Sequence, residues 1–149
     1  MVAWGQNNEG QTTVPVLAGV AAVAAGTTRS LSLLKTGTVV AWGSGAAVPA
    51  GLTGVTHIAA GTDHFLARKN DGSVVAWGDN SYLQAPAAPG VATATQGAAG
   101  TKHSLALLAN GTVSAWGDNS FTLLGKIMRS PCGPISSPPK WRGLTRTMC

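Results

Sequence analysis

The side chains best suited to chemistry are three histidines, five acids and two cysteines, and their spacing does not indicate a metal site. A zinc site needs three or four convergent ligands. The cysteines, Cys132 and Cys149, lie far along the chain from His57, His64 and His103. His64 and His103 occupy the same place in successive units of a repeating pattern, so they belong to neighbouring units. We therefore predict no metal site, and expect His64 to be half-buried and bonded to backbone.

The remaining candidates do not form a catalytic arrangement either. The acids lie mostly in turns, without a carboxylate pair for acid–base work, and Asp71 and Asp79 fit the role of turn formers. No nucleophile elbow surrounds Ser30 or Ser104, and no phosphate-binding Gly-rich motif is present. The sequence predicts a protein without catalytic residues, without a cofactor and without a small-molecule substrate.

The glycines and tryptophans point instead to a repeat. The tripeptide Ala-Trp-Gly returns at intervals of 38, 35 and 39 residues. A second marker, Ala-Ala-Gly, ends at Gly26, Gly61 and Gly100 and keeps the last two intervals. A fixed period of this length is typical of a repeat array. The tryptophans of the first marker are Trp4, Trp42, Trp77 and Trp116.

Each unit contains three short apolar segments, whose length of 5–9 residues favours strands over helices. The first is Val20–Ala25, Val55–Ala60 and Val91–Ala99; the second is Ser30–Leu34, His64–Arg68 and His103–Leu108; the third is Thr38–Trp42, Ser73–Trp77 and Thr112–Trp116.

The second and third segments are joined by hairpin signals, Thr36-Gly37, Asp71-Gly72 and Asn110-Gly111. Such pairs favour the positive φ angles of a type I′ turn, which we predict here. Both faces of the second segments are largely apolar, as expected for a sheet covered on both sides. We therefore predict an all-β fold, a partial, open β-propeller of about three four-stranded antiparallel blades with an irregular C-terminal tail.

The pattern at Gly54–Asn80, Gly-Val-x-x-Ile-Ala-Ala-Gly-x-x-His-x-Leu-Ala followed by Asp-Gly-x-Val-Val-Ala-Trp-Gly-Asp-Asn, resembles the regulator of chromosome condensation repeat. The short unit is closest in style to the bacterial branch, which includes a seven-bladed β-lactamase inhibitory protein. The resemblance covers residues 1–121 and implies a propeller that works by protein–protein contact. It also implies an alternative function, because eukaryotic relatives include an exchange factor for a small GTPase that docks on chromatin.

The predicted organisation departs from that family in number and at the C-terminus. Units lie near residues 2–39, 40–74 and 75–113, with the start of a fourth at 114–121, so the chain resembles a fragment of a larger bacterial propeller. Residues 122–149 are Pro-rich and carry five basic residues and no acid, which accounts for the net charge of +5. Three interpretations stay open: a disordered basic tail, a cap on the blade stack, or an out-of-frame translation.

Composition narrows the class of protein further. Hydrophobic residues make up 44% of the chain and charged residues only 10%, which is typical of a folded domain. No apolar run is long enough to cross a membrane, and no signal peptide is recognisable. The compartment stays open, with a secreted or cell-surface parent protein as one expectation. Nucleic-acid binding is not expected of the repeats and would act through the basic tail.

Binding is expected in loops, because repeat scaffolds carry function there. The loops after Ala-Ala-Gly and after Trp-Gly are two connections apart and should share one face. Only Tyr82 and Phe121 offer aromatic anchors for a protein partner. The uncovered blade edges should also favour self-association. The candidate partner-binding residues are Asp63, Asp79, Asn80, Tyr82, Lys102, Asp118 and Phe121.

Overall fold

The computed structural model describes residues 1–45, 47–85 and 91–120. Residues Met1–Asn119 form one compact unit, and the fold below is that of this unit. Phe121, both cysteines and the predicted tail at 122–149 lie outside the described residues.

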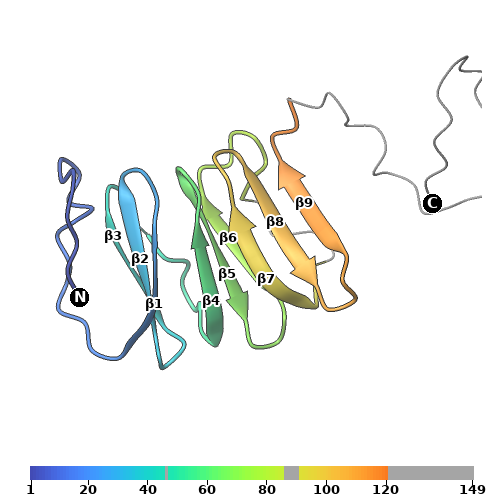
Figure 1. Cartoon of the computed structure of the whole chain (residues 1–149), viewed down its shortest axis with the longest axis horizontal. Helices are drawn as coiled ribbons and strands as arrows, with labels where there is room; N and C mark the ends of the chain where they lie inside the picture. The colour runs from blue at the N-terminus through green and yellow to red at the C-terminus, as the bar shows by residue number, and fades with distance from the viewer. Residues whose placement is uncertain (46, 86–90, 121–149) are drawn as a thin grey trace, which may run out of the picture. The chain divides into compact units, whose positions relative to one another are not determined.

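The described residues form nine strands in three antiparallel sheets, each built from three strands that follow one another in the chain (Figure 1). We call these sheets blades 1, 2 and 3. The all-β propeller-blade prediction is confirmed, whereas the predicted fourth strand is missing from each described blade. The strands are β1 Val20–Ala25, β2 Arg29–Leu34 and β3 Val39–Gly43; β4 Val55–Ala60, β5 His64–Lys69 and β6 Val74–Gly78; β7 Ala94–Ala99, β8 His103–Leu108 and β9 Val113–Gly117.

The second and third strands of each blade pair through a tight hairpin. In blade 1, the N–H of Gly37 donates to the carbonyl of Leu34, and the N–H of Leu34 donates to Thr38. Among the residues of the three hairpin turns only the glycines have positive φ, 80° at Gly37 and 81° and 83° at its equivalents. The type I′ prediction is therefore wrong. The turn is the three-residue kind that needs one left-handed glycine.

The two faces of each blade differ in their side chains. The register places Trp42 opposite Ser30, Trp77 opposite Phe65 and Trp116 opposite Ser104. The adjacent register positions are Leu31, Leu66 and Leu105, which point to the other side. We call these the Trp face and the Leu face of a blade.

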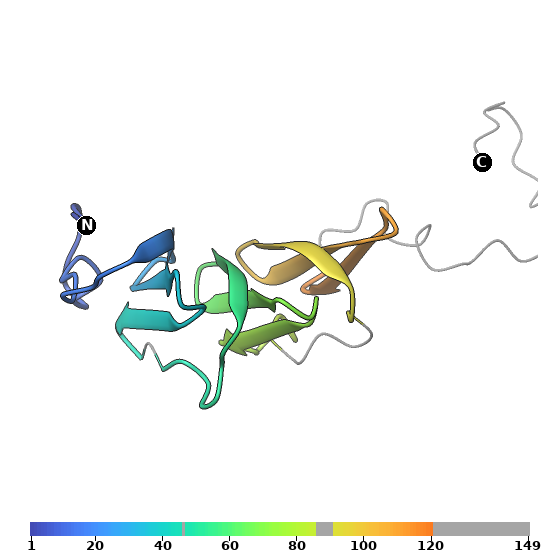
Figure 2. The same ribbon diagram turned by 90° about the horizontal axis from the view of Figure 1, so that it is seen from below.

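The blades stack with the Leu face of one against the Trp face of the next, and their succession is visible in both views (Figures 1 and 2). Leu31 and Leu33 of blade 1 share a core with Phe65 of blade 2. The rings of Phe65 and Trp77 lie 5.5 Å apart in that joint. Leu66 of blade 2 packs in the same way with Ala94, Ala106 and Trp116 of blade 3. Blade 2 is covered on both sides, which explains why Phe65 and Ala67 on one face of β5 and Leu66 on the other are all buried.

Candidate functional site: the loop rim of the blades

The two kinds of predicted loop meet at one end of each blade. The N–H of Asp79, just after Trp77-Gly78, donates to the carbonyl of Asp63 over 2.8 Å, and the N–H of Asp118 donates to Lys102 over the same distance. Because β2–β3-type pairs are antiparallel, the hairpin turns lie at the opposite end of the strands. We call the surface formed by residues 62–63, 79–85, 101–102 and 118–119 the loop rim.

Tyr82 and Lys102 meet on this rim, although they come from different blades. The Lys102 Nζ lies 4.0 Å from the centroid of the Tyr82 ring, within cation–π range. The interaction with the Tyr82 side chain, together with the negative charges of Asp118 and Asp79, raises the pKa of Lys102. Tyr82 remains 42% exposed. The rim thus presents an aromatic ring and a cation that stays charged, bordered by carboxylates.

Asp79 and Asn80 shape the loop that carries Tyr82. Asp79 Oδ1 accepts hydrogen bonds from the N–H and hydroxyl of Ser81, and these bonds lower the pKa of Asp79. Its Oδ2 accepts from the Gln84 side chain over 2.8 Å. Asn80 Oδ1 accepts from the N–H of Ala85. These two residues therefore act mainly as turn formers, and Tyr82 is the side chain that they present.

Sequence reasoning missed a set of polar residues between the blades. The His64 ring nitrogen Nε2 lies 2.9 Å from Ser104 Oγ. Ser104 in turn donates to the main-chain carbonyl of Gln84, which also accepts from Trp116 Nε1. Since Ser104 has one proton to give, His64 must donate from Nε2. His64 is therefore fully buried and bonded to a side chain, not half-buried and bonded to backbone.

The buried environment of His64 also determines its charge. Its Nδ1 is buried without a hydrogen-bond partner. Protonation there would place a charge in an apolar joint, and burial accordingly lowers the pKa of His64. In blade 1, Arg29 takes the place of this histidine and donates from Nη1 to the carbonyl of Asp63 in blade 2. One cationic or imidazole side chain thus links each blade to the next.

A sequence signal could have found the Gln84 carbonyl. Gln11 and Gln84 each lie seven residues after the tryptophan of their unit. The Gln11 carbonyl accepts from Ser30 Oγ and Trp42 Nε1 in blade 1, as Gln84 does in blade 3. The second unit has no glutamine at this position. The residue at this position is Pro49, and Trp77 Nε1 of blade 2 is buried without a partner.

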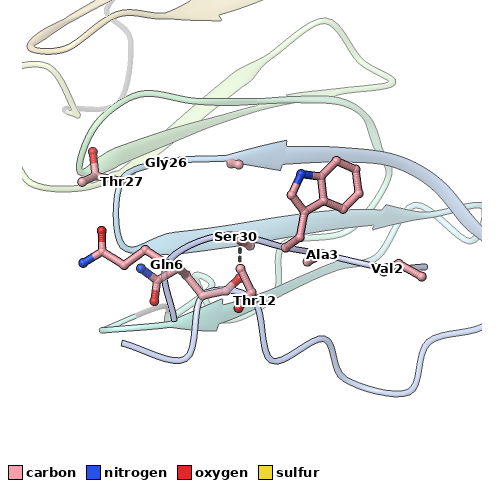
Figure 3. Close-up of a pocket in the computed structure, with 10 residues that line it drawn as sticks. Val2, Ala3, Gln6, Thr12, Gly26, Thr27 and Ser30 are labelled. Carbon is pink, nitrogen blue, oxygen red and sulfur yellow. Dashed lines mark hydrogen bonds between the residues drawn. The ribbon is translucent and has the colours of Figure 1, made fainter. Parts of the chain in front are cut away.

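The described residues contain no group of three or more His, Cys, Asp or Glu side chains that could hold a metal ion. No helix long and apolar enough to cross a membrane occurs in the same part of the chain. A hollow of about 350 Å³ lies beside blade 1, and Gly26, Thr27 and Ser30 are among the residues that line it (Figure 3).

Comparison with known proteins agrees with the blade architecture. Residues 55–84 and 94–122 match the family described as the Regulator of chromosome condensation (RCC1) repeat. No curated protein sequence matches the chain.

Three solved structures illustrate the likeness. Prp20p from Saccharomyces cerevisiae, described with its binding to Gsp1p and histones, is 26% identical with a TM-score of 0.60 over 72% of this chain and 33% of its own. Human WBSCR16 is 24% identical with a TM-score of 0.62, over 76% of this chain and 41% of its own. The ectodomain of the Physcomitrella patens receptor kinase CR4 is 23% identical with a TM-score of 0.60, over 76% and 34%.

The chain spans about a third to two fifths of the length of these structures. The matched residues include the whole of blades 2 and 3, whose strands, turns and stacked tryptophans have been described above. Residues 55–84 and 94–122 of the chain therefore match the regulator of chromosome condensation repeat, and the solved structures of Prp20p share its blade architecture.

Proposed function

We propose that the chain is a non-catalytic protein-interaction module that binds its partner through the loop rim of blades 2 and 3. The observation that carries this proposal is the Tyr82–Lys102 pair, a half-exposed aromatic ring under a fixed cation. Tyrosine is enriched among the residues that dominate protein interfaces, because it buries a large area with few rotatable bonds.

The charges beside Tyr82 indicate what kind of surface the protein partner should present. The negative charges of Asp79 and Asp118 act on Lys102, and Asp63 belongs to the same rim, so carboxylates border this cation. A partner that offers basic side chains around an apolar pocket would complement it, with the pocket receiving Tyr82. Asn80 contributes at the edge of the same loop, and Phe121, outside the described residues, stays a predicted contact.

The experiment selects binders for the immobilised chain from a displayed library of genomic fragments, and then measures their affinity for matched variants. Tyr82→Ala and Lys102→Ala should each weaken binding at least tenfold, the size of a hot-spot loss of more than 1 kcal/mol. The matched control is Lys35→Ala, the same change in an exposed hairpin turn at the opposite end of the strands. Binders that lose affinity only with Lys35→Ala would contradict the proposal.

A second candidate, regulation of a small GTPase, rests on the similarity to Prp20p, whose description names binding to Gsp1p. Release of a fluorescent nucleotide from Gsp1p in the presence of this chain tests it directly. We expect no acceleration, because the matched region corresponds to only 33% of the Prp20p chain. Faster release would replace the non-catalytic proposal with an exchange activity. Membership of a larger bacterial propeller stays a prediction.

A further inference from the structure

The two outer faces of the blade stack are the same kinds of face that are buried within it. Blade 1 presents its Trp face, where Val23 is 60% exposed, whereas the equivalent Ile58 of blade 2 is 6% exposed. Blade 3 presents its Leu face, where Val113 is 62% exposed, whereas the equivalent Val74 of blade 2 is 7% exposed. One chain therefore carries both halves of a blade joint, at opposite ends of the stack (Figure 1).

The polar groups of a joint are divided between the same two ends. In the joint of blades 2 and 3, His64 donates a hydrogen bond from Nε2, and Ser104 Oγ accepts it. His103 is the equivalent of His64 and is exposed on blade 3. Ser30 is the equivalent of Ser104 on blade 1, and it holds the same hydrogen bond to a glutamine carbonyl, that of Gln11, over 2.8 Å.

A hollow marks the place where the missing histidine would enter. Figure 3 shows Ser30, Gly26 and Thr27 around it, with Ala3 and Val2 along its side. Gly26 belongs to a line of glycines at which successive blades approach most closely: a Cβ on Gly26 would lie 2.7 Å from the carbonyl oxygen of Gly61. The hollow thus lies where the glycine and histidine of a preceding blade would pack.

We infer that two copies of this chain associate head to tail, with the Leu face of blade 3 in one copy stacked on the Trp face of blade 1 in the other. His103 enters the hollow and donates to Ser30 Oγ, and Leu105 covers Val23, as Leu66 lies against Gly97 in the joint of blades 2 and 3. We choose a second copy as the partner because the joints within the chain already pair a Leu face with a Trp face. The two outer faces of the chain are one of each kind. The contact cannot form within one chain, since its two halves lie at opposite ends of the stack.

The N-terminal segment adds a feature that distinguishes this contact from simple hydrophobic adhesion. Trp4 precedes Gln11 as Trp77 precedes Gln84, so residues 2–5 occupy the place of the last strand of a preceding blade. Trp4 is 86% exposed there. The incoming β9 would need that place, so residues 2–5 must move aside on association.

Sedimentation velocity of the full chain over a range of concentrations tests the inference. The wild type should associate, whereas Val23→Asp and Val113→Asp should each be monomeric alone, because each change destroys one half of the joint. An equimolar mixture of these two variants retains one intact pair of faces and should form a 1:1 dimer. Val16→Asp, at an exposed position outside both faces, should behave as wild type.

Two further variants test whether His103 and residues 2–5 take part in the association as proposed. His103→Ala should weaken the association about fivefold, the effect of one lost hydrogen bond. Deletion of residues 2–5 should strengthen it. A monomeric wild type, a variant that still pairs with itself, or weaker association after the deletion would each overturn the inference. None of these results depends on the loop rim, so the proposed function is judged separately.

Discussion

Two glycines at the same joint allow the stacking of blades 2 and 3 to be tested by one substitution made twice. Gly61 is buried, and a Cβ there would lie 2.5 Å from Cε1 of His64 and would clash with the carbonyl oxygen of Gly100. Gly97 stands at the position where the previous unit has Ile58. A Cβ there would lie 3.8 Å from Leu66 Cδ1, an ordinary van der Waals contact.

The magnitudes follow from these contacts. Neither glycine has a positive φ, so alanine is compatible with both backbones and restricts the unfolded chain equally, a gain of about 0.4–1 kcal/mol. At Gly97 that gain stands alone, so Gly97→Ala should raise the free energy of unfolding by this amount. At Gly61 the extra methyl must displace backbone, at a cost of roughly 1–3 kcal/mol, so Gly61→Ala should lower it.

Urea denaturation followed by tryptophan fluorescence measures both variants against wild type. The two midpoints should move in opposite directions with unchanged slopes, since a change in slope would indicate a change in the surface exposed on unfolding. A Gly61→Ala variant as stable as Gly97→Ala would refute the close approach of Gly61 to blade 3.

The remaining predictions concern the polar groups of the joints. Ser104→Ala should lower the free energy of unfolding by about 1–3 kcal/mol, because it leaves buried partners unsatisfied. Ser30→Ala, at the half-buried outer face of blade 1, should lower it by less. Chemical denaturation of the two variants measures the difference. Because burial lowers the pKa of His64 below the usual 6.5, the unfolded chain binds the proton more readily, so stability should fall as pH drops below that value. Thermal denaturation between neutral pH and pH 5 should show this fall, with a smaller slope in His64→Gln.

The repeat made the strands predictable, because a marker that recurs in phase reports the same local structure several times. All second and third segments became strands within a residue or two of their expected bounds. The first strand of blade 3 is the exception, since it begins at Ala94 and not at Val91. Three residues inserted before it shift the phase in this unit, and periodicity alone does not show where an insertion is absorbed.

The turn type and the rim contacts depended on geometry that residue identity does not specify. Asp71-Gly72 is compatible with two hairpin turns, and only the backbone path shows that a single residue adopts positive φ. Asp71 instead accepts hydrogen bonds from Ser73, which lower its pKa to about 2. Tyr82 and Lys102 were candidates separately. Their contact arises from the stacking of neighbouring blades, which brings the loop after blade 2 beside a loop of blade 3.

The His64 environment shows a similar limit. Its place in the repeat was recognisable, but its partner lies one unit later, at a position where the second unit has Phe65 in place of serine. The partner of a side chain that bonds across a joint can be predicted only when both of the units that form the joint are considered together. In the joint of blades 1 and 2, Arg29 stands in place of the histidine and Phe65 in place of the serine. Arg29 accordingly donates to a different acceptor, the carbonyl of Asp63.

The stacking of separate hairpin sheets has a consequence for how cooperatively the chain unfolds. The main contacts between sheets join β1 and β2 to β4, and β4 and β5 to β7, so stability is passed from neighbour to neighbour. In such a linear array an end unit loses one interface when it opens, whereas the central unit loses two. Amide hydrogens in β5 should therefore exchange with solvent last, and opening should spread inward from the two ends.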